Sequence, residues 1–355
     1  MKRLIVGTCA VLLSVSCALH AHDRDDDDND WERGGGKVTF AIIGDLPYNA
    51  LESEKLDRVI ADINADKRVR FTMHNGDVKS GSSPCDDATF TARLAQINTL
   101  QKPVFYTPGD NEWTDCHRAG AGRFNPLERL TRLRQIFYAQ PDFSIGGTPV
   151  PVFSQRRVPG YETYVENSLW MRAGVVFGMV HVVGSNNNLD PWSGIDNTDA
   201  YATPRADRVA EFKAREAANL MWLDTIFETA KRTGAIAVMI GMQANPNFDL
   251  PATDQQRQGF NAFIDKLAKL TIAFGKPVVL THGDSHYFRI DKPLLAATPG
   301  STAPTSLENF TRLESFGSPN VHWVRVTVDR KDANVFKIEQ RIVAENNFPR
   351  EMIAP

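Results

Sequence analysis

The sequence has no surplus of charge of either sign. Its 355 residues include 40 Lys plus Arg and 43 Asp plus Glu, which leaves a formal net charge of -3. A nucleic-acid-binding surface needs clustered basic residues, so we expect no nucleic-acid-binding patch. The hydrophobic share of 42% is that of an ordinary globular protein, and the length suffices for one large domain or two average ones.

Apolar runs long enough to cross a membrane are also missing. The N-terminal apolar stretch, residues 4–15, follows the positive residues 1–3 and precedes small residues. It is too short and wrongly flanked for a span, and it predicts a secretory signal peptide over residues 1–21. Cys17 lacks the preceding Leu of a lipidated Cys, since Ser14 stands there, so we expect no lipid anchor. The chain should be exported to the periplasm or the medium, with no membrane span in the mature protein.

Cysteine is scarce. Of four Cys, Cys9 and Cys17 lie in the predicted signal peptide, which leaves Cys85 and Cys116. An exported protein with two remaining Cys most simply forms one disulfide.

Internal repeats and a Gly-rich phosphate loop are absent, because the glycines at 34–36 precede a strand and not a helix. The preceding run HDRDDDDND at 22–30 is too densely charged to collapse, and it lacks the spaced Gly and distal Glu of a calcium loop. We therefore expect a disordered acidic and Gly-rich linker over 22–37, a single domain over 38–345 and a tail over 346–355.

Apolar periodicity predicts a βαβαβ beginning. Strands at 37–45, 69–74 and 104–106 alternate with helices, the first of which has Leu56, Val59, Ile60 and Ile63 on one face. This order is typical of crossover units in a largely parallel sheet. Two or three strands are expected in 161–183, then a helix that buries Val209, Phe212, Leu220, Leu223 and Phe227, then strands at 235–242, 277–286, 322–328 and 335–342 and a helix at 260–272. The long polar loop 184–207 is of the kind that more often carries function.

A Gly-Asp pair ends each of the first three strands. Asp45, Asp77 and Asp110 follow Gly44, Gly76 and Gly109. The carboxyl ends of neighbouring parallel strands face one crevice, so we expect these carboxylates to converge there. A late strand adds His282, Asp284 and His286 at alternate positions, which would share a side if the strand runs that far. Carboxylates with imidazoles are ligands for cations such as zinc, manganese or iron, and without a cation such a cluster must protonate or repel itself apart.

These motifs resemble the calcineurin-like metallophosphoesterases. The resemblance rests on GDLPY (44–48), NGDVKSG (75–81), PGDNEW (108–113), GMQANP (241–246) and THGDSH (281–286), with a Trp-Leu helix end at LMWLDTIF (220–227). Order and spacing match over most of residues 38–290. The resemblance implies an α/β fold, a four-layer αββα sandwich with two mixed sheets.

The sequence departs from the family pattern at five places. Pro47 and Asn111 stand where the family has His, and Gln243 lies near another expected His. Asp110 replaces the usual Asn, and Asp284 replaces the first His of the last motif, while His286 keeps the second.

The resemblance implies a hydrolase of phosphate esters with two divalent metal ions, manganese, iron, zinc or magnesium. Asp77 would bridge the ions, with Asp45 and His286 on one, and Asp110 with Gln243, His282 or Asp284 on the other. A bridging hydroxide would attack phosphorus, Asn111 would face the substrate oxygen and Glu112 would orient the ligands. His117 and Arg118 would either grip the phosphate of a small substrate or belong to a solvated loop.

Position on adjacent motif turns pairs Cys85 with Cys116. The missing His residues leave an alternative open, a metallophosphoesterase-like binding protein with impaired catalysis and one metal ion or none. The pattern also leaves open which phosphoester is bound and the oligomeric state.

Overall fold

The computed structural model describes residues 36–297 and 303–347. The expected signal peptide, Cys17 and most of the acidic linker lie outside the described residues, as does most of the C-terminal tail. The first strand begins at Lys37, and the last element, η4, is Ala344–Asn346.

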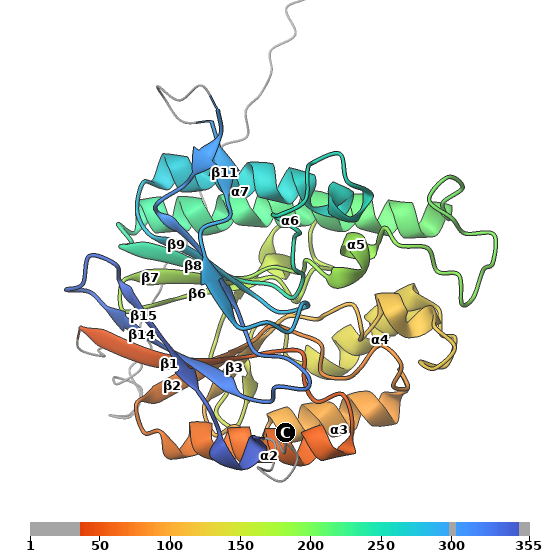
Figure 1. Cartoon of the computed structure of the whole chain (residues 1–355), viewed down its shortest axis with the longest axis horizontal. Helices are drawn as coiled ribbons and strands as arrows, with labels where there is room; N and C mark the ends of the chain where they lie inside the picture. The colour runs from red at the N-terminus through yellow and green to blue at the C-terminus, as the bar shows by residue number, and fades with distance from the viewer. Residues whose placement is uncertain (1–35, 298–302, 348–355) are drawn as a thin grey trace, which may run out of the picture. The chain divides into compact units, whose positions relative to one another are not determined.

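Two mixed β-sheets form the α/β fold (Figure 1). The first sheet has the order β15-β14-β1-β2-β3-β4. Its strands are β1 (Lys37–Ile43), β2 (Val69–His74), β3 (Pro103–Tyr106), β4 (Ile145–Gly146), β14 (Trp323–Asp329) and β15 (Phe336–Arg341). Strands β1, β2 and β3 pair in parallel, which confirms the predicted crossover beginning.

The second sheet has the order β10-β13-β9-β8-β7-β6-β5. Its strands are β5 (Phe153–Ser154), β6 (Ser168–Arg172), β7 (Val175–Met179), β8 (Ala237–Gly241), β9 (Val278–His282), β10 (Arg289–Asp291) and β13 (Phe310–Glu314). A separate small hairpin joins β11 (Leu295–Ala296) and β12 (Thr305–Ser306). Two strands, β6 and β7, lie within 161–183 as predicted, and the segment from Tyr161 to Val165 before them folds into successive turns, closed by the Tyr164 N–H donating to Tyr161 O.

Helices cover the outer face of each sheet (Figure 1). Helices α2 (Ala50–Ala65), α3 (Asp87–Ile97) and α4 (Pro126–Phe137) share an apolar core with the first sheet. Helices α6 (Ala206–Arg232) and α7 (Asn261–Phe274) share another with the second sheet. The short elements are α5 (Gly184–Asn188), η1 (Thr114–His117), η2 (Gln155–Arg157) and η3 (Gln255–Phe260).

The buried faces of α2 and α6 agree with the prediction to different degrees. On α2, Leu56, Val59, Ile60 and Ile63 are buried as predicted. On α6, the expected Phe212, Leu223 and Phe227 are buried, whereas Val209 and Leu220 are half-exposed. The long α6 rotates its apolar stripe, so that Trp222 and Ile226 join the buried face instead.

Aromatic rings join the inner faces of the two sheets. Phe71 of β2 lies edge-on to Trp170 and Phe177 of the second sheet, with ring centroids 5.8 and 5.3 Å apart. Phe40 lies edge-on to Phe177 at 5.4 Å, and Phe105 stacks on Trp170. Such pairs add to the apolar area they bury, so this layer fixes how the two sheets meet.

We expect Phe71→Ala to lower the free energy of unfolding by about 3–5 kcal/mol, because the change removes a fully buried ring between the sheets. Chemical denaturation monitored by circular dichroism measures this loss. Leu51→Ala, at a position 61% exposed, is the control and should change the value by less than about 0.5 kcal/mol. Equal effects of the two substitutions would contradict the packing described here.

Candidate functional site

The three Gly-Asp turns meet at the carboxyl ends of β1, β2 and β3, as the sequence predicts. The Asp45 N–H donates to Gly76 O at 3.0 Å, which ties the first turn to the second. A Cβ on Gly76 would lie 2.7 Å from the Gly109 nitrogen, so the second and third turns touch through backbone that admits no side chain. Asp45 and Asp77 themselves have positive φ values of 54° and 52°. Backbone strain of this kind concentrates at functional sites.

Asp77 lies at the centre of the cluster. Its Oδ1 accepts from the Asn111 N–H at 3.1 Å. Its Oδ2 accepts from three neutral donors: the Tyr48 hydroxyl at 3.0 Å, Asn111 Nδ2 at 2.7 Å and Gln243 Nε2 at 3.2 Å. Both oxygens of the carboxylate expected to bridge two ions therefore already have hydrogen bonds from the protein.

Asp45 and His286 lie on one side of Asp77. Asp45 Oδ1 accepts from the Asp284 N–H at 2.8 Å and lies 3.9 Å from His286 Nε2, while Asp45 Oδ2 is buried without a hydrogen-bond partner. His286 Nδ1 is 2.7 Å from Ser318 O, an acceptor only, so that nitrogen carries the proton. Nε2 of the neutral ring is then free to accept, and the Tyr48 hydroxyl lies 3.2 Å from it. A metal-binding His is commonly oriented in this way.

Asp110 and Asp284 lie on the other side, against the backbone of Gly184. A Cβ on Gly184 would be 2.7 Å from Asp284 Oδ1 and 2.8 Å from Asp110 Oδ1. Asp110 Oδ2 accepts from the Ser185 hydroxyl at 2.9 Å, and Asp110 Oδ1 is buried without a partner. Gln243 Nε2 reaches Asp284 Oδ1 at 3.3 Å, so Gln243 connects this pair to Asp77.

The last strand ends earlier than the sequence suggests. Strand β9 stops at His282, and Asp284 and His286 follow in a turn with φ values of 75° and 65°. The structure does not bring His282 to the cluster. Thr281 accepts a hydrogen bond from Asn75 beside the second Gly-Asp turn, and in a strand the next side chain points to the other face. The charges that act on the His282 ring are those of Arg312, Arg289 and Asp291, and burial lowers its pKa to about 3.

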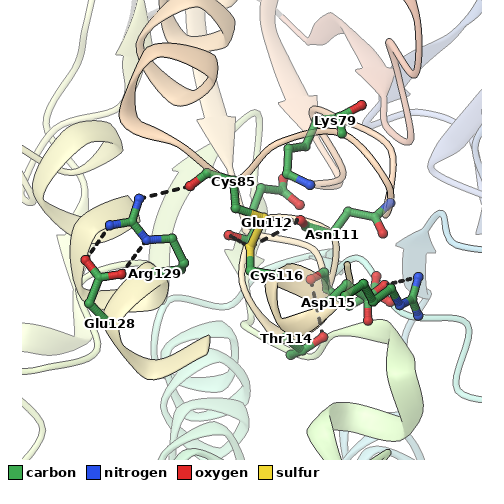
Figure 2. The surroundings of a disulfide bond; sticks show 12 residues. Lys79, Cys85, Asn111, Glu112, Thr114, Asp115, Cys116, Glu128 and Arg129 are labelled. Atoms are coloured by element: carbon green, nitrogen blue, oxygen red, sulfur yellow. Dashed lines mark hydrogen bonds and ion pairs between the residues drawn. A yellow bond between two sulfur atoms is a disulfide. The ribbon is translucent and has the colours of Figure 1, made fainter. Parts of the chain in front are cut away.

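Glu112 lies behind Asp77 and holds the second turn. It is fully buried, and its Oε1 accepts from the Val78 N–H at 3.0 Å and from the Tyr106 hydroxyl at 2.9 Å. Burial raises the pKa of Glu112. Lys79 is also buried, and burial lowers its pKa. The nearby charge of Glu112 acts in the opposite direction and raises the pKa of Lys79 (Figure 2). Glu112 therefore positions the turn through Oε1, while its Oε2 is buried without a hydrogen-bond partner.

Burial and mutual repulsion dominate the electrostatics of the cluster. Burial and then the charge of Asp284 raise the pKa of Asp45, and burial and then the charge of Asp110 raise that of Asp77. For Asp284 the same causes raise the pKa to about 8. Removed from water without a cation, these carboxyls hold protons at pH values where an exposed Asp is charged.

His117 and Arg118 follow the third turn. His117 is buried, and its Nδ1 accepts from the Gly194 N–H at 3.0 Å. Burial and the nearby Arg118 charge lower the pKa of His117 to about 4. Arg118 is exposed and pairs with the buried Asp115 at 2.7 Å. Both residues lie beside the cluster, on the Asp110 side.

Three residues that were not predicted as site residues also contact the cluster: Tyr48, Ser185 and Asp115. Tyr48 follows Asp45 by three residues in GDLPY, and its hydroxyl touches Asp77, Asn111 and His286. The Ser185 hydroxyl lies between Asp110 and Asp115, 2.7 Å from Asp115 Oδ1. In the sequence, Ser185 lies in the long polar loop 184–207, which was already expected to carry function.

The side chains of the cluster are of the types that bind metal ions, but they are not gathered around one point. In the described ranges, no three His, Cys, Asp or Glu side chains are grouped so that they could hold a metal ion as placed. The side chains instead form two pairs, Asp45 with His286 and Asp110 with Asp284, on either side of Asp77. Each pair contains a buried carboxylate oxygen without a hydrogen-bond partner, which is the donor a divalent cation requires. Each pair thus offers one unpartnered carboxylate oxygen and one further side chain of a type that binds cations.

The predicted disulfide is confirmed. Cys85 and Cys116 are bonded, with Cα atoms 5.7 Å apart, and join the segments that follow the second and third turns (Figure 2). Arg129 of α4 donates to Cys85 O at 2.9 Å and fixes the same segment from outside. A disulfide fits a protein of an oxidising compartment. No helix in the described part of the chain is both long and apolar enough to cross a membrane.

Comparison with known proteins finds a distant structural similarity at low sequence identity. No family model and no curated protein matches the chain. Among solved structures, the chain is similar to one described as "GAP50 the anchor in the inner membrane complex of Plasmodium". The identity is 12%, the TM-score is 0.44, and the alignment covers 86% of this chain and 89% of that one. These values are too low to transfer a fold or a function.

We expect the variant Cys85→Ala/Cys116→Ala to lose about 3–4 kcal/mol of unfolding free energy, because the bond closes a loop of 31 residues. Urea denaturation of the oxidised parent and of the double variant measures the difference. Reducing the parent with dithiothreitol should produce a loss of similar size. A double variant as stable as the oxidised parent would show that the bond does not constrain the chain.

A second prediction concerns pH. In protein freed of divalent metal by a chelator, stability should fall as pH rises from about 5 to about 8. The folded-state pKa values of Asp284 (about 8) and Asp115 (about 7) lie above the ordinary value of 3.8, so the unfolded chain releases its protons first. Thermal unfolding at several pH values measures the fall, and Asp284→Asn should make it shallower. An unchanged pH dependence of stability in Asp284→Asn would show that the Asp284 carboxyl does not cause the fall.

Proposed function

We propose that the chain is a calcineurin-like metallophosphoesterase that hydrolyses phosphate esters with divalent cations. One observation carries the proposal: four carboxylates, those of the buried Asp45, Asp77 and Asp110 and of the half-buried Asp284, converge at the ends of neighbouring strands. A cation is the simplest compensation for buried like charges. Unpartnered oxygens on Asp45 and Asp110, on either side of Asp77, mark where cations would bind.

The α/β fold with two mixed sheets supports the finer assignment to a metallophosphatase-type αββα sandwich. Helices on both outer faces and ring contacts between the inner faces are the features such a sandwich needs. The disulfide supports export, and we propose the periplasm or the medium as the compartment.

In this proposal Asp45 and His286 hold one cation, Asp110 and Asp284 hold the other, and Asp77 lies between them. Oxygen-rich sets of this kind favour manganese or magnesium, with iron and zinc as alternatives. When bound, the cations would neutralise charge on the phosphoryl group and lower the pKa of a water molecule.

The chain's own residues would bind and orient the ester. Asn111 Nδ2 and the Tyr48 hydroxyl are 3.0 Å apart, and both now donate to Asp77 Oδ2. Turned toward substrate, either group can donate to a phosphoryl or leaving-group oxygen without carrying charge. Gln243 is held by its Oε1, which accepts from the Gly184 N–H at 2.7 Å, so its amide keeps Asp77 and Asp284 in register.

A second candidate is a phosphoester-binding protein with impaired catalysis. It is favoured by the three neutral donors on Asp77 Oδ2, which satisfy that oxygen without any cation. Metal content of protein purified without chelator separates the candidates. Two ions per chain favour the hydrolase, and no ion favours the binding protein.

We expect Asp77→Asn to abolish metal-dependent hydrolysis, because the change removes the charge between the two proposed cation positions. Asp265→Asn, on the exposed face of α7, is the matched control and should leave turnover unchanged. Assays with monoesters, diesters, nucleotides and pyrophosphate in the presence of manganese provide the measurement. Turnover by Asp77→Asn equal to that of the parent would rule out the proposed mechanism.

Asn111→Ala should behave differently. It removes a neutral donor and no charge, so metal content should match that of the parent while kcat falls on the order of 100-fold. Metal analysis and steady-state kinetics on the same preparation test both statements. Loss of metal in Asn111→Ala would instead make Asn111 part of the metal site.

A further inference from the structure

A cavity of about 300 Å³ lies beside the acid cluster. It is bounded by the segment after the third Gly-Asp turn and by the polar loop that follows β7. Its walls include Asp115, His117, Arg118, Ser185, Trp192 and Tyr201. This volume is at the lower end of pockets that hold small organic molecules.

The cavity adjoins the acid cluster through Ser185. The Ser185 hydroxyl lines the cavity and also donates to Asp110 Oδ2 at 2.9 Å. Thr114, another wall residue, donates to Asp110 O at 3.2 Å. A phosphate held at the cluster would therefore have its organic group directed into this cavity.

The walls combine hydrogen-bonding groups with one guanidinium, that of Arg118, and two carboxylates, those of Asp115 and Asp190. Arg118 is paired with Asp115, and the Asp190 carboxylate accepts from the Tyr201 hydroxyl at 2.5 Å. His117 Nδ1 accepts from the Gly194 N–H, so its Nε2 carries the proton and is a neutral donor. Such walls suit a group with many hydroxyls better than an alkyl chain or a second anion.

Two aromatic residues complete the walls. Trp192 is buried, with Nε1 donating to Asn188 Oδ1 at 2.9 Å, whereas Tyr201 is 42% exposed at the mouth. Tyr201 therefore supplies the accessible aromatic surface, and such a surface beside hydrogen-bonding groups recognises molecules that have both apolar C–H faces and polar edges. A sugar ring has both.

The wall is held in place before any ligand binds. Residues 185–188 adopt left-handed backbone, with φ between 49° and 68°, a strained run for non-Gly residues. Buried Arg215 stabilises it by donating to Asn187 O at 3.0 Å and to His181 O at 3.1 Å. Asp199 accepts from the Trp192 N–H at 2.6 Å and pairs with buried Arg208.

We propose that this cavity binds the sugar portion of a sugar phosphate whose phosphate lies at the acid cluster. The assignment rests on the proposed function for the position of the phosphate, and it names the substrate class. Sugar phosphates should bind more tightly than inorganic phosphate and phenyl phosphate.

The test uses titration calorimetry with the phosphonate analogue of glucose 6-phosphate, which cannot be hydrolysed because CH₂ replaces the ester oxygen. Manganese is present throughout, and inorganic phosphate is the reference ligand. Ser193→Trp places a bulky ring on an exposed wall position and should weaken phosphonate binding at least about tenfold, with inorganic phosphate unaffected. Ser306→Trp, on the exposed β11–β12 hairpin, is the control.

Tyr201→Ala provides a milder change. It should weaken phosphonate binding about tenfold by removing one aromatic surface, whereas Tyr161→Ala, outside the cavity, should not. The proposal is overturned if the parent binds the phosphonate no more tightly than inorganic phosphate, or if Ser193→Trp and Ser306→Trp bind it equally. Phosphonate binding that is lost in Ser193→Trp supports the cavity assignment even if Asp77→Asn retains full turnover, an outcome that would reject only the hydrolytic mechanism.

Discussion

The structure depends on how buried carboxylates are compensated at the ends of three parallel strands. Asp45, Asp77 and Asp110 are buried, and Asp284 joins them from the turn after β9. Burial and mutual repulsion raise the pKa of Asp45, Asp77 and Asp284, so without positive charge the crevice costs folding free energy near neutral pH. The surrounding structure reduces this cost with backbone N–H groups, the Tyr48 hydroxyl and the amides of Asn111 and Gln243.

The hydrogen bonds are distributed unevenly among the carboxylates of the cluster. Asp77 receives hydrogen bonds on both oxygens, whereas one oxygen each of Asp45 and Asp110 has none. The neutral donors therefore satisfy the centre of the cluster and leave a carboxylate oxygen without a hydrogen bond on either side of it. The same amides replace imidazoles that the resemblance would place there. Lower affinity for the ions is the expected consequence, because an amide donor competes with a cation for the same carboxylate.

The sequence predicted the turns better than the side-chain arrangement. Apolar runs that stop at Gly-Asp identify β1, β2 and β3, and the meeting of their carboxyl ends follows from parallel topology. The ends of β9 and the place of His282 could not be read in this way, because positive φ at Asp284 and His286 breaks the alternation of a strand. Ser185 reaches Asp110 through a left-handed turn held by Arg215, a long-range contact that no local pattern encodes.

We propose that the Asp45–His286 and Asp110–Asp284 pairs on either side of Asp77 bind divalent cations. Anomalous diffraction from crystals soaked in manganese tests it most directly. We predict anomalous peaks at two positions, one between Asp45 and His286 and one between Asp110 and Asp284. If manganese labels other sites on the protein and the map has no peak at the cluster, the two pairs do not bind divalent cations.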